Sequence, residues 1–155
     1  MKHFRPTSLF VLLVTAALSF ATVSCKKIQQ NYIMNGEWEV LEVNLNGGTL
    51  NQMEQFLPDY VSNSTCCKYV VTFGDEGVCT STLTIDGDIR EQSVGEWNMP
   101  ERSKIYFKVD EYVDGLFDLE REGDGVWILH APVNNIEAYN VGEVEMAIRT
   151  TRIKN

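Results

Sequence analysis

Short runs of alternating apolar and polar residues, separated by turns rich in glycine and aspartate, constrain this chain more than any other feature. The clearest run is SKIYFKVDE, in which Ile105, Phe107 and Val109 share one parity. A period of two residues places such side chains on one face of a β-strand. The pattern continues from Gly36 onward and predicts an all-β domain.

Eight such runs predict eight strands, over residues 36–46, 67–74, 78–86, 88–98, 103–111, 114–121, 125–131 and 143–153. Most connections are short, as in GDEG at 74–77 and EGDG at 122–125. Tight connections join antiparallel neighbours, and eight strands in sequence order can close and remove the exposed edges of an open sheet. We therefore expect one eight-stranded up-and-down antiparallel barrel over residues 36–155.

The long connection GGTLNQMEQFLPDYVSNST predicts one short helix after the first strand, at 50–57. Thr49 and Gln52 have the spacing of a capping box, and Pro58 would end the helix. Its apolar residues follow at helical spacing: Met53, Phe56, Leu57 and Tyr60. We expect this stripe to cover one end of the barrel.

Residues 1–24 have the features of a signal peptide. Lys2 and Arg5 precede an apolar run, Leu9–Val23, that is shorter than the roughly 20 residues of a membrane span. The sequence TVSC at 22–25 resembles a bacterial lipobox, in which the cysteine is lipidated. The resemblance implies that Cys25 is a lipid anchor to the membrane. Ordinary cleavage after Ser24 is the alternative.

Residues 25–35 would then form the lipidated N-terminus and a polar tether. Surface-exposed lipoproteins of some Gram-negative gut bacteria carry an acidic run after this cysteine. Lys26, Lys27 and the following residues contain none. The comparison favours an outer-membrane lipoprotein on the periplasmic face.

Acidic residues outnumber basic ones, 22 to 13, which gives a net charge of −9. Removal of Lys2 and Arg5 with the signal would make the charge more negative still. An acidic surface repels nucleic acid and anionic headgroups, so we expect no nucleic-acid partner.

The tripeptide GEW occurs at 36–38 and again at 95–97, with unrelated flanks, so it does not mark a duplicated unit. Glycine permits a sharp bend or the close approach of another backbone, and tryptophan supplies a large apolar surface to cover an end of the barrel interior. In the first strand Trp38 and Val40 share one parity while Val43 takes the other, which predicts a bulge near Val40.

Here the chain resembles the lipocalin-like calycin barrels, in which a G-x-W opens the first strand. In that family the tryptophan packs beneath an arginine or lysine of the last strand. Gly36 and Trp38 match this motif, and Arg152 shares the inward parity of the last strand whereas Arg149 does not. The resemblance implies a barrel-closing pair, Trp38 and Arg152. It extends to the small lipocalin-like lipoproteins of Gram-negative gut bacteria and implies binding of a small apolar or amphipathic ligand.

A left-handed Gly77 in the GDEG turn would pair Gly74 with Val78 and fix the register of the hairpin. Phe73 would then face Cys79, and Cys67 would face Ile85. The inward parities give the candidate ligand-binding residues: Tyr69, Phe73, Ser81, Leu83, Trp97, Phe107 and Phe117. We expect an apolar cavity open opposite Trp38, with the helix at 50–57 and the loop at 131–142 as its gates. A barrel filled by these large side chains would instead serve as an interaction or structural module of a cell-envelope complex.

The sequence contains no pattern that indicates a catalytic or a metal-binding site. The mature chain has a single histidine, His130, and the acidic turns lack the spacing of a calcium loop. Cys66 and Cys67 would lie roughly 20 Å from Cys79 along the hairpin, so only a bridge between the adjacent pair is within reach. We predict neither an enzyme nor a cofactor.

Overall fold

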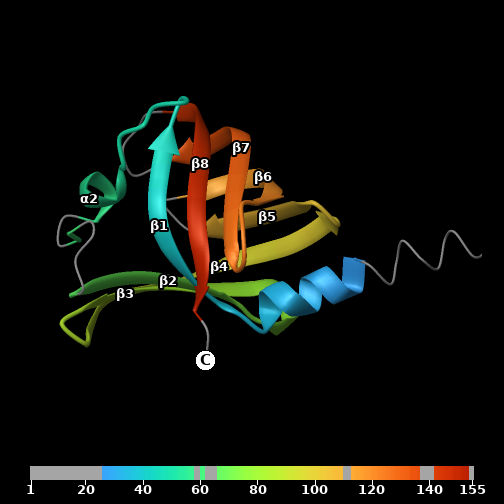
Figure 1. The fold of residues 1–155 in the computed structure, drawn as a ribbon, viewed down its shortest axis with the longest axis horizontal. Coiled ribbons are helices and arrows are strands. Elements are labelled where there is room, and N and C mark those ends of the chain that lie inside the picture. Colours follow the sequence, from blue (N-terminus) through green and yellow to red (C-terminus); the bar gives the residue numbers. More distant parts are fainter. Residues whose placement is uncertain (1–25, 58–59, 62–65, 110–112, 137–141, 154–155) are drawn as a thin grey trace, which may run out of the picture.

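A closed barrel of eight antiparallel strands forms this protein, with each strand paired to its sequence neighbours and β8 paired to β1 (Figure 1). The computed structural model describes residues 26–57, 60–61, 66–109, 113–136 and 142–153. The strands are β1 (Glu37–Leu45), β2 (Cys67–Phe73), β3 (Val78–Ile85), β4 (Asp88–Glu101), β5 (Lys104–Val109), β6 (Val113–Arg121), β7 (Val126–Ile136) and β8 (Gly142–Ile153). The predicted fold class is confirmed.

The register of the β2–β3 hairpin agrees with the sequence-based prediction. Phe73 pairs with Cys79, and Cys67 pairs with Ile85. The turn between them is one turn of 3₁₀ helix, η1 (Asp75–Gly77), and Gly77 has a φ of 79°. This φ is left-handed, a conformation in which glycine carries no side-chain penalty. Because the observed register equals the predicted one, the parity along β2 and β3 assigns inward and outward side chains correctly.

A bulge in β1 shifts the register between Val40 and Glu42, as the change of parity predicted. Two other strands, β4 and β7, are longer than predicted. β4 continues to Glu101 through Pro100, and β7 continues to Ile136 through Pro132; each contains a register shift next to its proline. Proline donates no ladder hydrogen bond and is tolerated at bulges, so it marks an irregularity in these strands rather than their end.

The helix after β1, α2 (Met53–Phe56), is shorter than predicted, and the prediction that Thr49 and Gln52 form a capping box is wrong. Its N-cap is Gln52, whose side chain makes no cap hydrogen bond. Asn51 serves instead, because its Oδ1 accepts hydrogen bonds from the backbone N–H groups of Met53 and Val43, each at 3.1 Å. One short side chain thus ties the helix start to β1. Pro58 and the side chain of Phe56 lie outside the described residues.

A second helix spans 26–34, where the sequence indicated only a tether. In Figure 1 it lies at the lower right, on the opposite side of the barrel from α2. It packs through Ile33, which is buried, while Ile28 stays exposed. A helix with one deeply buried apolar residue leaves no amphipathic period to detect. Cys25 and the signal segment before it lie outside the described residues. Neither helix in the described part of the chain is long and apolar enough to cross a bilayer.

Candidate binding cavity

Trp38 closes the end of the barrel on which the N-terminal helix lies. The indole is buried, and its Nε1 donates a hydrogen bond to the carbonyl oxygen of Ile33 at 3.0 Å. Tyr32 packs edge-on against the ring at 5.8 Å between centroids, and Trp127 does so at 6.4 Å. The N-terminal helix, β1 and β7 therefore each contribute one ring to an aromatic lid.

Arg152 lies opposite Trp38 in the β1–β8 ladder, so the structure brings the predicted pair together. The ring beneath its guanidinium, however, is Tyr32, with the arginine Cζ 4.4 Å from that ring's centroid. Nη2 also donates to the carbonyl oxygen of Asn35 at 2.9 Å. Arg152 thus holds the N-terminal helix on the barrel, and the expectation that it stacks on Trp38 is corrected to Tyr32.

The glycines of the two GEW copies each allow a close approach. A Cβ on Gly36 would lie 2.8 Å from Trp38 Nε1 and 3.0 Å from Arg152 Nε. A Cβ on Gly95 would lie 2.0 Å from the carbonyl oxygen of Lys108 on β5. The contact at Gly95 is with backbone and excludes a side chain, whereas at Gly36 the side chains of Trp38 or Arg152 would have to shift.

The second tryptophan, Trp97, repeats the role of the first. It is buried, and its Nε1 donates to the carbonyl oxygen of Gly74 at 2.9 Å. Its ring packs edge-on against Phe73, with centroids 5.2 Å apart. GEW is therefore one packing device used twice: the glycine makes room, and the tryptophan caps a backbone carbonyl.

An almost wholly apolar cavity of about 90 Å³ lies inside the barrel. Of the predicted ligand-binding residues, Tyr69, Phe73 and Phe107 line it. The prediction missed most of the wall, which consists of aliphatic side chains from several strands: Val40, Val43, Val71, Ile105, Val109, Val113, Met146 and Ile148. Their inward parity was visible in the sequence, but no signal gave their height along the barrel axis.

The other four candidates are buried without lining the cavity: Ser81, Leu83, Trp97 and Phe117. Phe117 stacks on Phe107, a residue that does line the cavity, with centroids 4.7 Å apart. The Ser81 hydroxyl hydrogen-bonds Tyr69. In the described structure these four residues do not line the cavity, and their contact with a ligand stays a prediction.

Both helical segments contribute to the cavity wall. Met53 and Leu57, at α2, line it and are 2% and 3% exposed, while Ile33 lines it from the N-terminal helix. The prediction that the segment after β1 covers the barrel interior agrees with this arrangement. Of the second predicted gate, residues 137–141 lie outside the described part of the chain.

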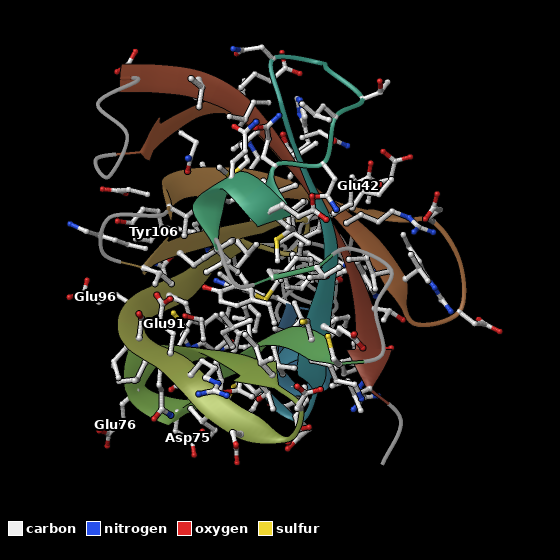
Figure 2. The ribbon with its side chains drawn as sticks, turned by 90° about the vertical axis from the view of Figure 1, so that its left-hand side faces the viewer. Glu42, Asp75, Glu76, Glu91, Glu96 and Tyr106 are labelled. Atoms are coloured by element: carbon white, nitrogen blue, oxygen red, sulfur yellow. The ribbon has the colours of Figure 1, made fainter. Side chains whose placement is uncertain are left out.

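The cavity carries little charge or polarity. Burial raises the pKa of Tyr69, so this hydroxyl stays protonated well into the alkaline range. The carboxylates of Asp75, Glu76 and Glu96 point outward from the barrel (Figure 2). An anionic group inside the cavity would find no cation there among the lining residues. The arrangement suits an uncharged, apolar guest.

The remaining chemistry-bearing side chains lie away from the cavity. His130 pairs with Glu145 at 2.8 Å, and both side chains are nearly half exposed. Cys79 is fully buried, and burial raises the pKa of its thiol to about 11. In the described part of the chain, no three metal-ligating side chains come together.

No protein-family model matches the chain, and no curated protein matches it either.

Proposed function

We propose that this protein binds a small, uncharged, predominantly apolar molecule inside its barrel. The observation that carries the proposal is the apolar cavity of about 90 Å³ inside the barrel, lined by side chains of β1, β2 and β5 to β8 and of two helical segments. Barrels of eight strands have an interior just wide enough for packed side chains or for one small ligand. A cavity that is empty of polar partners stays dry and gains by accepting an apolar guest.

The cavity volume limits the guest. Pockets for drug-sized ligands measure about 300–1,000 Å³, whereas an apolar cavity of about 150 Å³ holds benzene. The guest is therefore a compact molecule or the end of a chain. A larger guest requires α2 to move, because Met53 and Leu57 form the wall on that side. A helix of four residues has no stability of its own, so its displacement costs the burial of those two side chains and the Asn51 hydrogen bonds that tie the helix start to β1.

Benzene needs a cavity of about 150 Å³, so as a first probe it tests the cavity together with the outward movement of α2. If it binds, the free energy of unfolding should rise by RT ln(1 + [L]/Kd), about 2.7 kcal/mol at one hundred times Kd. Val71→Phe adds a ring to the cavity wall and should abolish this rise, with an overpacking cost of about 1–3 kcal/mol. Val94→Phe is the matched control, because Val94 is exposed on β4 and its variant should keep the response. A wild-type protein whose unfolding midpoint is independent of benzene contradicts the proposal.

An interaction module is the second candidate function, and one specific observation favours it. Phe107 contacts both Phe73, at 6.0 Å between centroids, and Phe117, at 4.7 Å. This aromatic cluster occupies part of the interior, and two of its rings, Phe73 and Phe107, border the cavity described above. Absence of a benzene response in wild type would leave a rigid barrel suited to a structural or adaptor role in a cell-envelope complex.

We also propose that the chain is a member of the small lipocalin-like lipoproteins, tethered by a lipid on Cys25 to the periplasmic face of the outer membrane. The proximity of Gly36, Trp38 and Arg152 supports the family, and the lipobox-like TVSC supports the anchor. Cys25→Ala should move the native protein from the membrane fraction to the soluble fraction. Wild-type protein that is already soluble and begins with an unmodified Cys25 would contradict the tether.

The role we propose is non-catalytic binding. It is supported by the position of His130, which pairs with Glu145 and is not among the residues that line the cavity. A nucleophile–base pair would have to meet the bound molecule to act on it.

A further inference from the structure

Cys66 and Cys67 place two thiols side by side at the start of β2. Their Sγ atoms are 2.8 Å apart, and the two residues are thiols rather than a disulfide. A disulfide bond is about 2.0 Å long, so bond formation needs a movement of less than about 1 Å between the sulfurs. The pair lies at the opposite end of the β2–β3 hairpin from η1.

We propose that Cys66 and Cys67 form a redox-active dithiol, which a low-molecular-weight disulfide oxidises to a bridge between adjacent residues. The proposal stands on the geometry of the two thiols and is independent of ligand binding in the cavity. It assigns the pair a reversible modification, whereas Cys79 remains a packing residue.

The two thiols differ in accessibility, which sets the order of the steps. Cys66 is partly exposed, while Cys67 is 3% exposed and belongs to the core. The hydrogen bond with Cys66, followed by burial, raises the pKa of Cys67. Cys66 is therefore the attacking thiol and Cys67 the resolving thiol.

The exchange balances in two displacements. Deprotonated Cys66 attacks one sulfur of the oxidant, forms a mixed disulfide and releases the first half of the oxidant, which leaves as a thiolate and takes a proton. Deprotonated Cys67 then attacks Cys66 Sγ and releases the second half in the same way. The two cysteines lose two electrons and two protons in total, and the oxidant becomes two thiols.

The bridge should be easy to reduce again. Adjacent Cα atoms are about 3.8 Å apart across a trans peptide, whereas disulfides usually join Cα atoms 4.4–6.8 Å apart, so the bridge is strained. Strained disulfides have higher reduction potentials and are the labile or regulatory ones. The backbone here is also held, because Asp86 N–H donates to the Cys66 carbonyl oxygen at 2.8 Å and Cys67 pairs with Ile85.

The test uses the full chain carrying Cys25→Ser, so that three thiols remain. After incubation with oxidised glutathione, two thiols should disappear together without a glutathione adduct, and peptide mapping should place the link within 66–67. The same result is expected for Cys79→Ser, the control. Cys67→Ser removes the resolving thiol and should trap glutathione on Cys66.

Three outcomes overturn the proposal: a stable glutathione adduct in the parent chain, a disulfide between two chains, or three unreacted thiols. If Cys67→Ser does not fold, Cys67→Ala replaces it, and the thiol count of the parent chain decides by itself. Reduction by glutathione should then restore both thiols; a bridge that resists reduction would show that it is structural rather than switchable.

Discussion

Replacement of Gly95 by alanine tests the packing device that the two GEW copies share. An alanine Cβ would lie 2.0 Å from the Lys108 carbonyl oxygen and 3.1 Å from Cys79 Sγ. Real Cβ atoms do not approach closer than 3.0 Å, so β4 and β5 must separate locally by at least 1.0 Å. The atom in the way is backbone within a paired ladder, and it cannot rotate aside as a side chain could.

The sign of the change in the free energy of unfolding distinguishes a close approach at Gly95 from open space. Where space exists, Gly→Ala in a strand stabilises by about 0.4–1 kcal/mol, because the unfolded chain loses freedom. At Gly95, overpacking costs about 1–3 kcal/mol and each weakened ladder hydrogen bond about 0.5–1.5 kcal/mol. The expected net effect is a loss of about 2–4 kcal/mol, a large share of a typical domain's 5–15 kcal/mol.

Urea denaturation measures the loss. With a slope of about 2 kcal/mol per molar, a loss of 3 kcal/mol lowers the midpoint by about 1.5 M. Gly123→Ala is the control, because a Cβ there meets nothing within 4 Å and its φ is not positive. It should leave the midpoint unchanged or raise it slightly. A Gly95→Ala protein as stable as wild type would refute the close approach of β4 and β5.

Three further changes have distinct expected results. Arg152→Ala should lower the free energy of unfolding by about 2 kcal/mol, because it removes a cation–π contact and a charged hydrogen bond. Arg149→Ala breaks only an exposed ion pair and should cost at most about 1 kcal/mol. Equal losses in urea denaturation would contradict the role assigned to Arg152. Asn51→Ala should lower the free energy of unfolding by about 1–3 kcal/mol, because two backbone N–H donors lose their acceptor. Thr49→Ala should be near neutral. A larger loss for Thr49→Ala than for Asn51→Ala would favour the capping box that the sequence predicted. The pKa of the Cys79 thiol is raised from 9.0 to about 11, so between these values the folded state keeps a proton that the unfolded state releases. The free energy of unfolding should therefore fall as the pH rises from 9 toward 11. Cys79→Ala should flatten that decline when unfolding is measured as a function of pH.

The strands and their pairing could be predicted because their determinants are local. Alternation fixes which side chains face inward, and the left-handed Gly77 fixes the partner of Phe73 four residues earlier. The ends of β4 and β7 were predicted too early, because Pro100 and Pro132 interrupt the alternation that marks a strand, although a proline is compatible with a bulge inside one. Here the tertiary ladder continued past both.

The candidate site was only partly predictable for a different reason. Parity places Phe117 and Ser81 inside the barrel, but it does not give their height relative to the cavity. The ring partner of Arg152 is Tyr32, which reaches it from the N-terminal helix, where Ile33 is the one fully buried apolar residue. Contacts that depend on docking of a separate segment leave no periodic trace in the chain.

The seam between β1 and β8 has a consequence for how the chain folds. Arg152 bonds the carbonyl oxygen of Asn35, 117 residues earlier, so the ordering of the aromatic lid waits for the last strand. Until then β1 offers one unpaired edge, and unpaired edges recruit other chains. Closure across such a sequence separation carries a high loop entropy and places barrels among the slower folders, in the millisecond-to-second range. The interval between synthesis of β1 and arrival of β8 is therefore when this protein is most exposed to misassembly, and substitutions in β8 should lengthen it more than substitutions in the β2–β3 hairpin.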